Sequence, residues 1–126
     1  MRHSKGILAA ALFLALSASI AAAAESKAVQ SMAGILMNLH HYPSDTEKQT
    51  LTQITQDKAA TADEKTVAQA LLDVQHTVAA ADKPKLEAIA GNDKAAASVK
   101  TLAGVILNLH HMPSDADKAK LQALTQ

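Results

Sequence analysis

The chain has 126 residues, of which 48% are hydrophobic, and its 12 basic residues balance 12 acidic ones. It has no cysteine and almost no aromatic residues, which excludes a disulfide framework, a cysteine-based metal site and a thiol nucleophile. The near-absence of aromatic residues also argues against a surface that binds single-stranded nucleic acid, because such a surface needs aromatic rings on which the bases stack.

Residues 1–24 have the three parts of an export signal. Arg2 and Lys5 are followed by an uncharged apolar run from Gly6 to Ile20 and then by alanines. The run is shorter than the roughly 20 apolar residues of a membrane-spanning helix, so we expect cleavage before Glu25 and no stable membrane anchor. The sequence therefore predicts export to the periplasm or the extracellular space.

Residues 25–126 are expected to form a single domain. Cleavage would remove two basic residues and no acidic ones, which leaves 10 lysines against 12 acids and a net charge of −2. Without a basic patch the domain is not expected to bind nucleic acid.

A 35-residue period runs through this domain. The octapeptide at 38–45, Asn-Leu-His-His-Tyr-Pro-Ser-Asp, recurs at 108–115 with Met for Tyr, and a weaker copy lies halfway between them. Three repeats follow from this register, at about 26–60, 61–95 and 96–126. A period near 35 is typical of helical hairpins, so the sequence predicts an all-α fold of about six short helices, arranged as a small bundle or a short solenoid.

Each repeat is expected to contain a helix, a tight break and a second helix. In the first repeat, apolar residues from Val29 to Leu39 follow helical spacing, and Pro43 is expected to end that helix at Tyr42. Ser44 and Glu47 form a capping-box pattern for the second helix. Similar caps are expected at Thr61 with Glu64 and at Ser114 with Asp117, while Asp82 and Gly91 should bound the second helix of the middle repeat.

The second helices are expected to point equivalent leucines inward, at Leu51, Leu86 and Leu121. Gly34 and Gly104 fall inside first helices, where glycine costs about 1 kcal/mol relative to alanine. We expect close packing of a neighbouring helix to explain them.

All five histidines of the predicted domain fall near the expected ends of the first helices. At 100° per residue, His40 would lie within the apolar arc, and His41 on a polar edge beside Asn38. One reading is structural, with His40 and His110 in the core and the other histidines complementing helix ends.

The other reading is a transition-metal site for copper or zinc, which imidazole ligands suit. The candidate ligands are His40, His41, Asp73, His76, His110 and His111. Asp73 and His76 have the carboxylate-x-x-His spacing of metal sites in helical bundles. An open solenoid would space His41, His76 and His111 as a ladder, whereas a closed bundle could bring His40 and His110 together.

No motif for a nucleophile, a phosphate loop or a dinucleotide is present, so we expect a protein that is not an enzyme. The sequence favours an exported helical-repeat protein that binds another protein or itself. The alternative is a small metal-binding protein that uses copper or zinc at its His-His pairs.

Overall fold

The computed structural model describes residues 25–126, so the predicted export signal at 1–24 lies outside the described residues. The described part folds into six α-helices, which confirms the all-α prediction. They are α2 (Lys27–Met37), α3 (Asp45–Gln56), α4 (Ala62–Leu72), α5 (Lys83–Ala90), α6 (Ala97–Leu107) and α7 (Asp115–Leu124). None of the described helices is long and apolar enough to cross a membrane.

The helix starts that the sequence predicts are confirmed. Ser44 and Thr61 each complete a capping box, with Glu47 and Glu64 respectively. The Ser114 side chain accepts a hydrogen bond from the Asp117 amide. In the middle of the chain, α5 lies between Asp82 and Gly91 as expected. The caps of Ser44, Thr61 and Ser114 satisfy amides that no carbonyl of the same helix can reach, and so they fix where α3, α4 and α7 begin.

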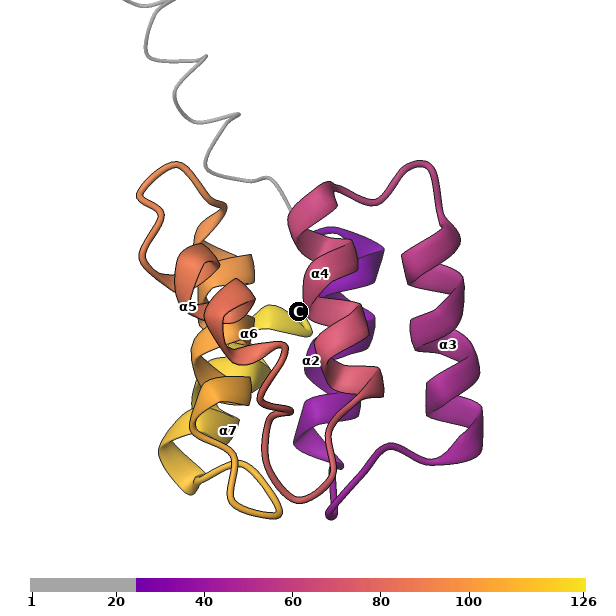
Figure 1. The fold of residues 1–126 in the computed structure, drawn as a ribbon, viewed down its shortest axis with the longest axis vertical. Helices are drawn as coiled ribbons and strands as arrows, with labels where there is room; N and C mark the ends of the chain where they lie inside the picture. Colours follow the sequence, from indigo (N-terminus) through magenta and orange to yellow (C-terminus); the bar gives the residue numbers. More distant parts are fainter. Residues whose placement is uncertain (1–24) are drawn as a thin grey trace, which may run out of the picture.

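The helices pack as a closed bundle rather than as an open solenoid. The first helices α2, α4 and α6 contact one another, and each second helix packs against the first helix of the next hairpin. α3 therefore packs on α4, α5 on α6, and α7 returns to α2. This closure brings the loops α2–α3, α4–α5 and α6–α7 to one end of the bundle, the lower end in Figure 1.

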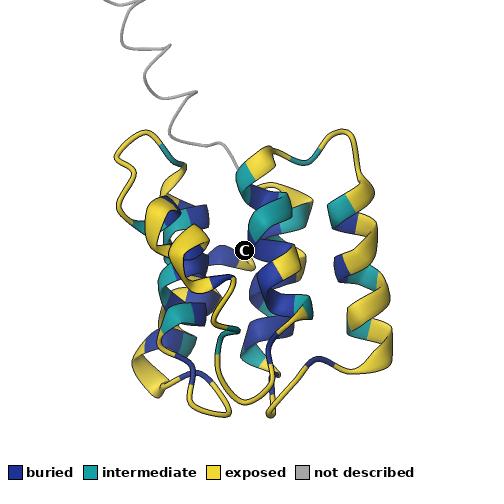
Figure 2. Ribbon diagram, in the orientation of Figure 1, coloured by how far each residue is buried: buried dark blue, intermediate teal, exposed yellow. Residues whose placement is uncertain are grey.

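The core lies between the facing sides of the helices, where buried residues gather in Figure 2. Leu51, Leu86 and Leu121 are completely buried, as the sequence predicts. Leu39 and its equivalents Val74 and Leu109 are also buried, although they lie beyond the ends of their helices. These apolar side chains anchor the loops of the lower end to the core.

Gly34 and Gly104 do not mark a close approach of helices, and that expectation is wrong. A Cβ atom at either position would meet no neighbouring element within 4 Å. Each glycine instead lies half-buried in an open part of its helix surface.

Gly104→Ala is therefore expected to raise the free energy of unfolding by about 1 kcal/mol, because alanine loses less backbone entropy than glycine in a helix. Urea denaturation measures the change. Gly91→Ala is the control, in which the same gain in the free energy of unfolding is not expected. Gly91 follows the end of α5, and an added Cβ there would lie 3.4 Å from the Glu87 carbonyl oxygen. A loss of stability in Gly104→Ala would contradict the open space around Gly104.

Candidate metal centre

His41, His76 and His111 each occupy the middle of a tight turn at the lower end of the bundle. Their φ angles are 71°, 68° and 68°, and they are the non-glycine residues with positive φ in the described chain. In each turn the amide after the histidine donates to the carbonyl before it, as from Tyr42 to His40 at 2.8 Å. This is the γ-turn with positive φ, which is rare because it strains the backbone.

The three turns are joined by a closed ring of backbone hydrogen bonds. The His76 amide donates to the His41 carbonyl at 2.6 Å, His111 donates to His76 at 2.7 Å, and His41 donates to His111 at 2.7 Å. The backbone amide and the backbone carbonyl of each of these three histidines are therefore both hydrogen-bonded. The surrounding bundle, closed by α7 against α2, holds the turns in place. Backbone strain maintained in this way is concentrated at functional sites in proteins.

The three imidazole rings converge on one point. Their Nδ1 atoms form a nearly equilateral triangle, with separations of 3.0 Å (His41–His76), 3.1 Å (His41–His111) and 3.0 Å (His76–His111). The rings meet edge to face, with centroids 4.8–5.0 Å apart. All three residues are exposed, and together they can hold a metal ion.

Protons alone cannot satisfy this triangle. A neutral imidazole nitrogen either carries a proton and donates or carries a lone pair and accepts. With three nitrogens in mutual contact, at least one contact must bring two lone pairs or two protons together. A cation bound to all three lone pairs removes the conflict.

The size of the triangle fits a metal that the three nitrogens cap from one side. With bonds of about 2.0–2.1 Å, nitrogens would lie about 3.3–3.4 Å apart at tetrahedral angles and about 2.9 Å apart at octahedral angles. The observed separations fall between these values. In either geometry all the ligands of the chain lie on one side of the ion, and at least one coordination position stays open.

The cluster also favours the neutral, metal-binding form of His41. Crowding by neighbouring groups removes water from His41 and lowers the pKa of its imidazole. Positive charge on His76, His111 or His40 would lower the pKa of His41 further. The His41 lone pair therefore remains available at lower pH than that of an isolated histidine.

The other members of the histidine pairs lie outside the cluster. His40 and His110 are exposed, so the expectation of a place in the apolar arc is wrong. The cause is the position of the helix end, because Asn38 caps α2 at Met37, four residues before His41. Beyond the cap, helical angles no longer apply, and Leu39 takes the buried position that the angles assign to His40.

Asp73, the carboxylate predicted to pair with His76, does not belong to the three-histidine cluster. It caps the end of α4, and its carboxylate accepts hydrogen bonds from the Gln69 side chain at 3.3 and 3.4 Å. Its proximity also helps to raise the pKa of Asp82. The i, i+3 spacing therefore does not create the ligand pair, because the helix ends at Leu72 before reaching His76.

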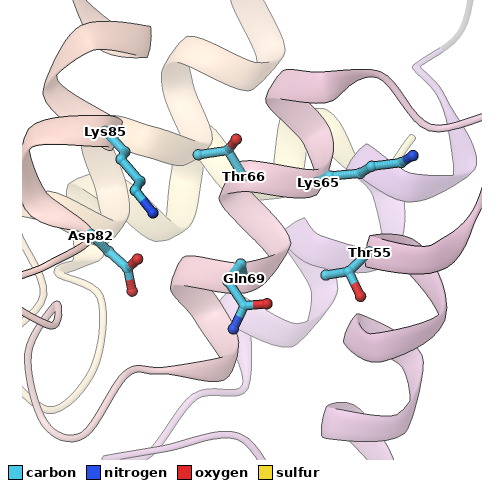
Figure 3. A pocket seen from close by; sticks show the side chains of 6 residues that line it. All are labelled: Thr55, Lys65, Thr66, Gln69, Asp82 and Lys85. Carbon is cyan, nitrogen blue, oxygen red and sulfur yellow. The ribbon is translucent and has the colours of Figure 1, made fainter.

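Asp82 lies in a separate cavity of about 270 Å³ between α3, α4 and α5, shown in Figure 3. Its side chain is buried, and its Oδ2 atom has no hydrogen-bond partner. Burial, chiefly, and then Asp73 raise the pKa of the Asp82 carboxyl. Lys65 and Lys85 line the same cavity, so it is a poorer place for a cation than the three-histidine cluster.

The sequence contained a signal that distinguishes the two histidines of each pair. In the middle repeat the first histidine is replaced by Gln75 and the proline by Val78, but the second histidine is kept as His76. The second histidine is therefore the one that is present in all three segments of the 35-residue period. Its convergence with the others depends on closure of the bundle, which no local pattern contains.

Comparison of the chain with protein-family models, with curated proteins and with solved structures finds no significant match. The function proposed for this chain therefore rests on the geometry of the cluster.

Proposed function

We propose that this chain is a non-enzymatic transition-metal-binding protein, in which His41, His76 and His111 bind one ion of zinc or copper through their Nδ1 atoms. The observation that carries the proposal is the triangle of Nδ1 atoms, with sides of 3.0–3.1 Å. Imidazole nitrogens suit both metals, and the backbone ring holds the ligands in position before the ion arrives.

A binding role is favoured over catalysis by the surroundings of the cluster. Metal-dependent catalysis generally uses a shaped cavity from which water is excluded. Here the three ligands are exposed at the end of the bundle. Of the three, His76 borders a shallow cavity of about 360 Å³ that the Tyr42 and Lys48 side chains also line. The predicted export signal supports a role outside the cytoplasm, where the protein would buffer or deliver the metal.

Isothermal titration calorimetry of the purified chain with zinc and with copper(II), in a buffer that does not bind metal, tests the proposal. We expect one ion per chain for at least one of the two metals. His76→Gln should weaken binding by more than about 100-fold, because even the loss of a partner behind a ligand costs 10–100-fold.

The matched control is His40→Gln, which makes the same replacement one residue from a ligand. Gln75 already occupies the equivalent position in the middle hairpin, so the fold should tolerate the change. This variant should still bind one ion per chain. The absence of binding heat for both metals, or equal losses in the two variants, would contradict the proposed site.

A further inference from the structure

The coordination sphere that one chain offers is incomplete. His41, His76 and His111 would bind an ion from the same side, because their Nδ1 atoms lie 3.0–3.1 Å apart and the ring of backbone hydrogen bonds links the turns that carry them. Leu39, whose equivalents are Val74 and Leu109, lies buried beneath these turns. The protein interior therefore closes the inner side, and the open position of the metal faces outward from the end of the bundle.

The surface around that open position has an unusual composition. We call residues 39–43, 74–78 and 109–113 the loop end; they contain no Asp, Glu, Lys or Arg, although 19% of the chain is charged. Among the described residues, the large hydrophobic side chains that are exposed are Tyr42 (57%) and Met112 (38%), and both belong to the loop end. Few charges together with exposed aromatic and methionine side chains are typical of the centre of a protein interface.

The loop end also carries two imidazoles that the metal cluster does not use. His40 and His110 are exposed, and each directly precedes a ligand in the chain. Their carbonyls accept the hydrogen bonds that close the γ-turns, so the backbone at these positions is fixed. Because each belongs to the same surface as the open coordination position, a second loop end placed opposite would bring an imidazole towards the metal.

We propose that a second copy of this chain completes the coordination, with His40 or His110 of each copy binding the metal held by the three histidines of the other. This inference rests on the proposed function. The residues of the loop end carry no fixed charge of their own, so between two copies they add no repulsion to that of the bound ions. The arrangement is reciprocal, as in a two-fold symmetric dimer, with one ion per chain.

The dimer should depend on the metal. The exposed residues of the loop end number nine, His40–Tyr42, Gln75–Thr77 and His110–Met112. Stable interfaces use about 20–30 residues on each side. The loop end is therefore too small to hold two chains together without the metal–imidazole bond.

Sedimentation velocity of the purified chain, with EDTA and with one equivalent of zinc or copper(II), tests the inference. We expect a monomer in EDTA, a dimer with metal, and a return to monomer when EDTA is added. The His40→Gln/His110→Gln double variant keeps the three-histidine cluster, so by calorimetry it should still bind one ion per chain, more weakly than the unmodified chain, but remain a monomer. Gln75→His, which adds a third such imidazole, should dimerise at least as well as the unmodified chain.

The possible failures are distinguishable. If calorimetry finds no metal binding, the proposed function itself fails. If the metal binds but the unmodified chain stays monomeric at every metal ratio, or if the double variant dimerises like the unmodified chain, the proposed function stands and the completion of the site by a second copy is overturned. Metal-induced aggregates of indefinite size would overturn it as well.

Discussion

Zinc or copper(II) should raise the melting temperature of the metal-free protein by roughly 10–20 °C when free metal is about 100-fold above its dissociation constant. A ligand at that concentration stabilises the folded state by about 2.7 kcal/mol. For a domain of this size, 1 kcal/mol corresponds to roughly 4–8 °C. The unfolded chain lacks the Nδ1 triangle, so the ion should bind it far less well. Thermal unfolding followed by circular dichroism, with and without metal, measures the shift.

The shift should depend on pH in a defined direction. A ligating imidazole must be unprotonated, so protons compete with the metal. The folded protein lowers the pKa of His41 below the ordinary value of about 6.5. The stabilisation by metal should therefore fall as the pH is lowered through the range in which histidine takes up protons, and the lowered pKa of His41 should move this loss to lower pH.

The metal-free protein needs its own melt at each pH. Because the pKa of His41 is lowered by folding, the unfolded state binds more protons below pH 6.5 and the fold itself loses some stability there. Only the difference between melts with and without metal reports on the site. For the unmodified chain, melts at pH 7.5 that superimpose with and without either metal would contradict the proposed function. For the His76→Gln variant, which lacks a ligand, superimposed melts are the expected result.

Much of the fold could be predicted from the sequence because its determinants are local. The capping boxes at Ser44 and Thr61 use residues three apart, and the buried positions of Leu51, Leu86 and Leu121 follow from helical spacing. The helix ends are predicted less accurately than the helix starts. Pro43 predicts a helix up to Tyr42, but α2 ends at Met37 with Asn38 as its C-cap, and Leu39 is buried beyond the helix end.

The geometry of the site could not be predicted for a different reason. The convergence of His41, His76 and His111 requires α7 to pack against α2, and that contact joins the two ends of the domain. It also requires a positive φ at each histidine, which local preference disfavours. The equal spacing of 35 residues marked the equivalent positions, but tertiary packing decided that they face one another.

The strained turns lead to the second large effect. In the metal-free protein, replacing His41, His76 and His111 together by glycine should leave a fold about 2–3 kcal/mol more stable than replacing them by alanine. A left-handed backbone costs an L-residue about 1–2 kcal/mol, whereas glycine adopts it freely. The greater freedom of glycine in the unfolded chain offsets part of this gain, about 0.4–1 kcal/mol for each site. Urea denaturation of the two triple variants in EDTA measures the difference.

In the control, the opposite order of stability is expected for glycine and alanine. Gln75 directly precedes His76 and has no positive φ, so there Gln75→Gly should be less stable than Gln75→Ala by about 0.4–1 kcal/mol. A triple alanine variant as stable as the triple glycine variant would mean that the backbone relaxes once the rings are removed. Suppose that glycine gives the more stable protein at the three histidine positions and the less stable one at Gln75. The chain then carries histidine at positions where glycine would suit the backbone better. The strain is then tolerated for the imidazole side chains and not for the shape of the turns.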